Sequence, residues 1–111
     1  MRAFALDDTL RERQQAGRLY FEFLRVPALS AGVYVLPAGG ADPQQPHAED
    51  ELYYVASGAG SIEVDGESLP VRAGSLIYVP AHAPHRFHTI TEELRILVFF
   101  APAEYTQAQQ G

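Results

Sequence analysis

The sequence predicts an all-β domain, either an antiparallel sandwich or a barrel, preceded by one short helix. After Gly17, short segments rich in β-branched and aromatic residues alternate with turn signals about every ten residues. Asp65-Gly66 is the dipeptide of a tight hairpin turn, which pairs two neighbouring strands in antiparallel fashion. The 111 residues are enough to build one hydrophobic core but not two, so one domain is expected.

Residues 1–18 are expected to form a helical segment that packs on the β domain. The stretch 6–17 is polar and has the start and stop signals of a short helix. Asp7 or Asp8 can cap its beginning, and Glu12 lies in an early turn. Gly17 can end the helix in the left-handed conformation.

The β domain is expected over residues 19–102, followed by a polar tail over 103–111 that we expect to fray. Strands are predicted at residues 19–26, 29–36, 50–57, 75–80, 84–90 and 94–102, with a hairpin at 60–71. The glycines and prolines of 37–46 predict a loop, and residues 91–93 predict a turn. The strand 94–102 is mostly apolar, which indicates that both faces are buried or that one meets a partner chain.

Composition and charge exclude several classes of function. The chain has no cysteine, so disulfides, thiolate ligands and cysteine nucleophiles are excluded. It has no lysine either, which excludes a lysine Schiff base. The net charge of -6 argues against a nucleic-acid partner. No apolar run is long enough to cross a membrane and no secretory signal is evident, so a cytoplasmic location is expected.

The four histidines indicate where chemistry can occur. Divalent metals bind imidazole and carboxylate groups, and alternate residues of a strand share one face. By this rule, one face of the first segment carries Gln45, His47, Glu49 and Glu51. One face of the second segment carries His85, Phe87 and Thr89. One inward face could therefore carry two histidines and a carboxylate, which is the donor set of many iron(II) sites.

The first of two spaced motifs lies between Gly39 and Gly58. Gly39 is followed by five residues, then Gln45-Pro46-His47, three residues, Glu51, six residues and Gly58. This spacing resembles the first motif of the cupin family, which has a histidine at the position of Gln45.

The second motif lies between Gly74 and Thr89. Gly74 is followed by five residues, then Pro80-Ala81-His82, two residues, His85, three residues and Thr89. It resembles the second cupin motif, which has glycine at the position of His82 and asparagine at that of Thr89. The two motifs occur in order with the predicted hairpin between them, and the resemblance covers roughly residues 19–102.

The resemblance implies a cupin-type antiparallel β-barrel, also described as a double-stranded β-helix or jelly roll, with one divalent metal ion near its centre. Carried over residue by residue, it implies that His47, Glu51 and His85 are metal ligands and that Gln45 stands at the remaining ligand position. A glutamine oxygen binds a divalent ion more weakly than imidazole does. Gln45 is therefore a long fourth ligand, a neighbour of the ligands, or a position open to water. Iron(II) is favoured, with zinc, manganese and nickel as alternatives.

Three further residues are candidates for a catalytic role: Tyr53, His82 and Glu49. Tyr53 shares the face of Glu51, so its hydroxyl can reach the cavity, although a strand tyrosine is ordinarily a core residue. His82 is either an extra ligand or general base, or a turn residue that tolerates a positive φ, which is the interpretation we favour. Glu49 and Asp50 are expected to be solvated acids of the loop, and Glu49 is the better candidate of the two for a residue that supports the ligands.

The sequence leaves three functions open. One is a metal-dependent enzyme of dioxygenase-like, isomerase or lyase type that acts on a small molecule, because the fold alone does not choose the reaction. Another is a non-catalytic barrel that binds or senses a small ligand with weak or no metal binding. The third is a structural dimer with an inactive site. A homodimer is expected in each case, with residues 19–26 at its interface.

Overall fold

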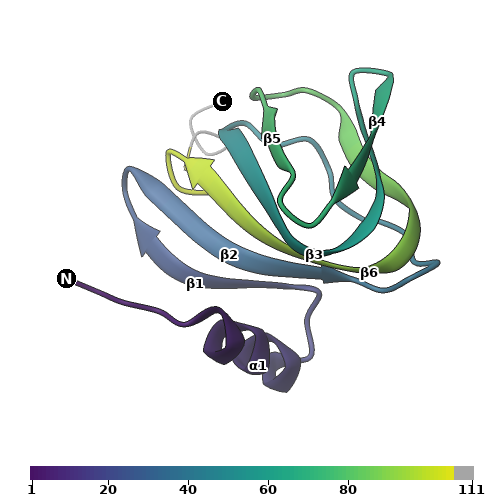
Figure 1. Ribbon diagram of the computed structural model, residues 1–111. Coiled ribbons are helices and arrows are strands. Elements are labelled where there is room, and N and C mark those ends of the chain that lie inside the picture. Colours follow the sequence, from purple (N-terminus) through teal and green to yellow (C-terminus); the bar gives the residue numbers. More distant parts are fainter. Residues whose placement is uncertain (107–111) are drawn as a thin grey trace.

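Two long antiparallel strands, β3 (Asp50–Val64) and β6 (His85–Ala101), form the centre of the fold in this computed structural model, which describes residues 1–106. Four shorter strands complete the sheet: β1 (Tyr20–Val26), β2 (Leu29–Leu36), β4 (Glu67–Arg72) and β5 (Leu76–Val79). The strand order is β1-β2-β6-β3-β4, and β5 pairs with the first part of β3. Figure 1 shows that the sheet curls around itself, so that β4 and β5 lie opposite β1 and β2. The predicted all-β antiparallel architecture is confirmed.

The curl of the sheet depends on irregular pairing in the middle of β3. The register with β6 shifts repeatedly between Val55 and Ser61. Gly58 lies in this region with a φ of 99°, where L-residues are strained. A Cβ atom at Gly58 would also collide with the carbonyl oxygen of Glu93, so only glycine lets β6 pass this close. Bulges of this kind bend strands, and here they let one sheet close into a barrel.

The alternation of side chains along β3 sorts them between the barrel interior and the outer surface. Glu51, Tyr53 and Val55 are buried, whereas Leu52 and Tyr54 are exposed, which confirms the predicted alternation. The interior is filled by one apolar cluster of buried side chains from all strands except β1: Tyr34, Leu36, Tyr53, Val55, Ile62, Val71, Val79, Ala83, Phe87, Ile90, Leu94, Ile96, Val98 and Phe100. The functional side chains described below lie at one end of this core.

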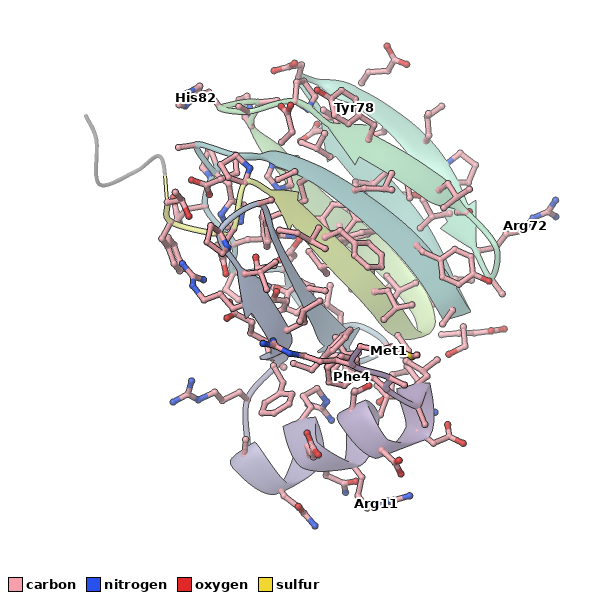
Figure 2. All side chains as sticks on the ribbon, turned by 90° about the vertical axis from the view of Figure 1, so that its left-hand side faces the viewer. Met1, Phe4, Arg11, Arg72, Tyr78 and His82 are labelled. Atoms are coloured by element: carbon pink, nitrogen blue, oxygen red, sulfur yellow. The ribbon has the colours of Figure 1, made fainter. Side chains whose placement is uncertain are left out.

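The helix α1 (Leu6–Ala16) packs against β1 and β2 on the outer side of the sheet (Figure 1). Its N-cap residue is Ala5, without a side-chain cap, so the prediction that Asp7 or Asp8 caps the helix is wrong. Both aspartates lie in the first turn, where they interact favourably with the helix dipole. Gly17 ends the helix with a φ of 69°, as predicted. Figure 2 shows Phe4 on this side of the sheet.

Several predicted boundaries differ from the structure. The predicted strands 84–90 and 94–102 are one strand, β6. Residues 91–93 do not form a turn between them, because Glu92 pairs with Ala59 of β3 and the strand continues. The strand predicted at 50–57 likewise continues to Val64. The tail over residues 103–111 was expected to fray, but its first residues, Ala103 and Glu104, are buried. Residues 107–111 of this tail lie outside the described part of the chain. Within residues 1–106, no helix has the length and apolar content needed to cross a lipid bilayer.

Candidate metal centre

The structure brings His47, Glu51 and His85 together from three places in the chain. His47 lies in the loop before β3, Glu51 is the second residue of β3, and His85 begins β6. Their ligand atoms all lie within 4.8 Å of one another, close enough to bind one ion. His85 pairs with Val64 at the far end of β3, so the curl of the sheet is what brings it to Glu51.

Backbone hydrogen bonds hold the loop that carries His47 against the barrel. The amide of His82 donates to the carbonyl oxygen of His47 at 2.6 Å, and the amide of Gly39 donates to that of Ile90 at 2.8 Å. His82 lies in the turn before β6 and Ile90 lies within β6. The position of His47 is therefore fixed by the same part of the chain that carries His85, although β3, β4 and β5 separate the two histidines in sequence.

The Asp42 side chain holds the same loop in place through hydrogen bonds. Its carboxylate accepts hydrogen bonds from the Tyr34 hydroxyl, from the backbone and side-chain amides of Gln44, and from the amide of Phe87 on β6. Gln44 in turn accepts a hydrogen bond from the Tyr53 hydroxyl at 2.9 Å. No local pattern in the sequence indicates this role of Asp42, because the partners that tie the loop down lie on β2, β3 and β6.

Glu51 and His85 form a buried pair that leaves polar atoms without hydrogen bonds. Glu51 Oε1 lies 3.1 Å from His85 Nε2, and each side chain is only 1% exposed. Neither oxygen of Glu51 nor Nε2 of His85 makes a hydrogen bond of acceptable geometry among the described residues. Buried polar atoms without partners are costly, and a divalent cation would satisfy all three at once. The residues present therefore fit a metal ion.

The ring of His85 is oriented for metal binding by its other nitrogen. Nδ1 lies 2.8 Å from the carbonyl oxygen of Ala83, so Nδ1 carries the proton and Nε2 offers its lone pair to the centre. Burial lowers the pKa of His85, but the Glu51 carboxylate and the Ala83 carbonyl raise it more, and the net shift is upward. For His47, burial dominates and lowers the pKa, which favours the neutral imidazole that a metal requires.

Glu104 is a further residue of the site, and the sequence does not indicate it. Its Oε2 atom lies 3.5 Å from His47 Nδ1. Its amide donates to the Ser30 hydroxyl at 2.9 Å, and its carbonyl accepts from the Arg25 guanidinium at 2.6 Å. Burial, together with nearby Glu22, raises the pKa of the Glu104 carboxyl to about 7. Nothing in the polar sequence after Pro102 signals that this segment turns back onto the barrel.

A cavity of about 460 Å³ adjoins these side chains. His47, Glu51, Gln45 and Glu104 supply polar groups to its lining, and most of the other lining side chains are apolar or aromatic. Gln45 is exposed, so it lies at the rim of the cavity rather than in its floor. The cavity is large enough for a small organic molecule next to the candidate ligands.

The three candidate catalytic residues are not among the side chains that line this cavity, although Tyr53 and Glu49 contact residues that do. Tyr53 is fully buried in the core, with its hydroxyl on Gln44. Glu49 is buried, and its carboxylate accepts a hydrogen bond from the Tyr105 amide at 2.9 Å, so the prediction that it is a solvated acid is wrong. His82 is exposed with a φ of 69°, as the turn interpretation predicts, and projects outward at the end of the molecule remote from α1 (Figure 2).

Comparison with known proteins decides the family. The family described as "Cupin domain" matches residues 32–100, which include both motifs and all three candidate ligands. The chain belongs to the cupin family. The resemblance seen in the sequence is therefore confirmed, and the barrel described above is a cupin barrel.

Several known proteins are similar to most of this chain. A protein of Streptomyces coelicolor whose function is uncharacterized is 48% identical over 104 residues, which is 94% of this chain and 99% of that protein. The structure of TT1209 from Thermus thermophilus superposes with a TM-score of 0.75 at 22% identity, covering 93% of this chain and 99% of the other. At 25% identity, the DMSP lyase DddQ from Ruegeria pomeroyi superposes with a TM-score of 0.64. That match covers 68% of this chain but only 39% of the lyase.

Proposed function

We propose that this cupin binds one divalent metal ion through His47, Glu51 and His85 and acts on a small organic molecule in the adjoining cavity. The observation that carries the proposal is that the three ligand atoms lie within 4.8 Å of one another beside a cavity of about 460 Å³. Two imidazoles and one carboxylate favour iron(II), and zinc, manganese and nickel also accept these donors. The expected reaction is dioxygenase-like or isomerase-like, and the name of the lyase among the similar structures supports small-molecule chemistry.

The bound metal would supply a Lewis acid or an oxygen-binding centre at its open positions. The chain's own residues would prepare the site for it. His85 is held in the required tautomer by the Ala83 carbonyl, and neither carboxylate oxygen of Glu51 has a hydrogen bond within residues 1–106. The remaining ligand position would be taken by the amide oxygen of Gln45 at the rim, which is a weak ligand, or by water or the substrate.

The alternative is a non-catalytic barrel that binds a small ligand without metal. The contact of 3.1 Å between Glu51 and His85 favours this alternative, because a protonated His85 would partly satisfy the carboxylate without an ion. The upward shift of the His85 pKa supports the same protonated pair. A ligand that raises the melting temperature equally with and without a chelator would support this alternative.

Metal analysis of variants separates the two functions. The protein should be purified without a histidine tag, loaded with iron(II) under anaerobic conditions, and analysed for metal content and then for oxygen uptake with candidate substrates. His85→Ala removes a proposed ligand, and His88→Ala is the matched control because His88 bonds Ser68 and Thr89 outside the site. We expect about one ion per chain in the wild type and in His88→Ala, and loss of the ion in His85→Ala. A wild type that binds no metal would overturn the proposal.

We also propose that the protein forms a homodimer. Strand β1 lies at the end of the strand order, so residues 19–26 include a sheet edge that another chain can approach. Exposed apolar side chains on the outer face of the sheet provide further contact area: Leu52, Tyr54, Leu76 and Tyr78. Light scattering at micromolar concentration tests this expectation, and a monomer would contradict it. The cytoplasmic location expected from the sequence stays a prediction.

A further inference from the structure

The cavity beside the candidate metal centre contains no cationic side chain. The sequence has no lysine, and its eight arginines all lie within the described residues 1–106. None of these arginines lines the cavity. Arg25 comes near, but its guanidinium bonds the Glu104 carbonyl and pairs with Glu22. A phosphate or carboxylate on a ligand would therefore find no arginine or lysine to pair with it.

The ionisable groups that do line the cavity favour neutral or positive ligands. Glu51 and Glu104 are both part of the lining, together with His47. A divalent ion held by His47, Glu51 and His85 would have its charge offset by Glu51 itself and by Glu104 next to His47. An anionic ligand would thus meet two acidic side chains, and no arginine or lysine to pair with it, in a partly buried site where charge interactions are only weakly screened.

Most of the other lining side chains are apolar or aromatic, and a series of aromatic rings begins at the candidate ligand His47. The ring of His47 lies 4.7 Å from that of Phe100, which lies 6.5 Å from the ring of Tyr20. Tyr20 in turn lies 6.1 Å from Tyr34, and all four rings line the cavity. Flat aromatic molecules gain most from such surroundings, because they can stack or pack edge-to-face against these rings.

Gly32 permits this arrangement of the rings. A Cβ atom at this position of β2 would collide with Cζ and the hydroxyl oxygen of Tyr20. The ring of Tyr20 therefore lies directly over the backbone of Gly32, and any larger residue would displace it. The aromatic wall depends on this pairing of β1 with β2.

We propose that the cavity takes an uncharged aromatic molecule that carries a hydroxyl or carbonyl oxygen, rather than a phosphorylated or carboxylated one. The aromatic body packs against Phe100, Tyr20 and Tyr34, and the oxygen faces the candidate ligands His47 and Glu51. This inference rests on the proposed function for the role of that oxygen. The selection against anions depends on the cavity walls alone.

Binding of a matched pair of probes tests this proposal. Calorimetric titrations with naphthol and naphthoate compare one aromatic body with a neutral and an anionic group, and a hexose phosphate is the third probe. Each probe is titrated into chelator-treated protein and into zinc-loaded protein. We expect naphthol to bind at least about tenfold more tightly than naphthoate in both forms, and the hexose phosphate not to bind.

A new cation in the lining should alter this preference. Leu19 lines the cavity and is 39% exposed in the single chain, so Leu19→Arg can place a guanidinium at the mouth without a buried charge. Because Leu19 also belongs to the proposed dimer interface, light scattering checks that the variant keeps the oligomeric state of the wild type. Leu69→Arg is the matched control, because Leu69 is 57% exposed on β4 and does not line the cavity. We expect Leu19→Arg to tighten naphthoate binding severalfold and Leu69→Arg to leave it unchanged.

The outcomes separate this proposal from the proposed metal site. Tighter binding of naphthoate or hexose phosphate than of naphthol in chelator-treated protein would overturn the selection against anions. Tighter binding of naphthoate only after zinc loading would overturn it too, while supporting the metal site. Selection of naphthol by a protein that binds neither zinc nor iron(II), manganese or nickel would support the cavity chemistry and contradict the metal site. Failure of every probe to bind at millimolar concentration would overturn the proposal.

Discussion

The carboxylate of Glu104 lies 3.5 Å from Nδ1 of His47, and the two side chains are 8% and 12% exposed. A carboxylate at one ring nitrogen of a ligand histidine fixes the tautomer and directs the other nitrogen to the metal. The segment after β6 therefore contributes to the candidate metal centre, although it contains none of the three proposed ligands.

Replacement of Glu104 should weaken metal binding. Glu104→Gln removes the carboxylate next to His47 Nδ1, and loss of a partner that orients a ligand typically weakens metal affinity by about 10–100-fold. Competition with a chromophoric chelator measures the affinity for zinc. Glu63→Gln is the control, because Glu63 pairs with Arg86 on the surface. Equal zinc affinity of Glu104→Gln and the wild type would show that this contact does not orient the ligand.

The same side chain should make the stability of the metal-free protein depend on pH. Burial raises the pKa of the folded Glu104 carboxyl from 4.5 to about 7, so the folded state holds this proton more tightly than the unfolded state. Its contribution to stability is complete below pH 4.5 and is lost as the pH rises through about 7. Glu104→Gln should therefore gain stability relative to the wild type between pH 5 and pH 8, by on the order of 1–3 kcal/mol. Urea unfolding in the presence of a chelator measures this, and a difference that does not change with pH would contradict it.

Asp42 should contribute more to stability than an exposed aspartate. Asp42→Ala leaves the Tyr34 hydroxyl, the Gln44 amides and the Phe87 amide without their acceptor, and should cost about 2–3 kcal/mol. Asp50→Ala removes an exposed hydrogen bond to the Ala81 amide and should cost less than about 1 kcal/mol. Urea unfolding compares the two variants. Equal losses would mean that the loop is not held by Asp42.

The two motif glycines Gly58 and Gly74 should differ in their tolerance of a side chain. Both have a positive φ, so alanine is strained at either position. A Cβ atom at Gly58 would collide with the Glu93 carbonyl, whereas one at Gly74 would meet nothing within 4 Å. We expect Gly74→Ala to cost about 1–2 kcal/mol and Gly58→Ala to cost several kcal/mol more or to prevent folding. Similar melting temperatures for the two variants would contradict the close approach of β6.

The features that depend on spacing could be predicted from the sequence. The alternation along β3 separates Glu51 and Tyr53 from Leu52 and Tyr54, because a strand turns each successive side chain to the opposite face. The cupin motifs identified His47, Glu51 and His85, which the structure brings within 4.8 Å of one another. Local patterns of this kind are visible in the chain without knowledge of its folding.

The features that depend on distant contacts could not be predicted from the sequence. Asp42 and Glu104 are ordinary acids of a loop and a tail until the fold supplies Tyr34, Phe87, Ser30 and Arg25 as partners. The polar residues 91–93 resemble a turn in sequence, but pairing with β3 keeps them in strand β6. Long-range hydrogen bonds outweigh local propensity at each of these places.

A crystal structure of the zinc-loaded protein, with the ion located by its anomalous scattering, tests the metal centre most directly. The account predicts one ion bound by His47, Glu51 and His85, with His85 Nε2 as a ligand atom because Nδ1 is held by the Ala83 carbonyl. An ion bound only by the exposed His82 or by His88, or a Glu51–His85 contact that persists without an ion at saturating zinc, would contradict it.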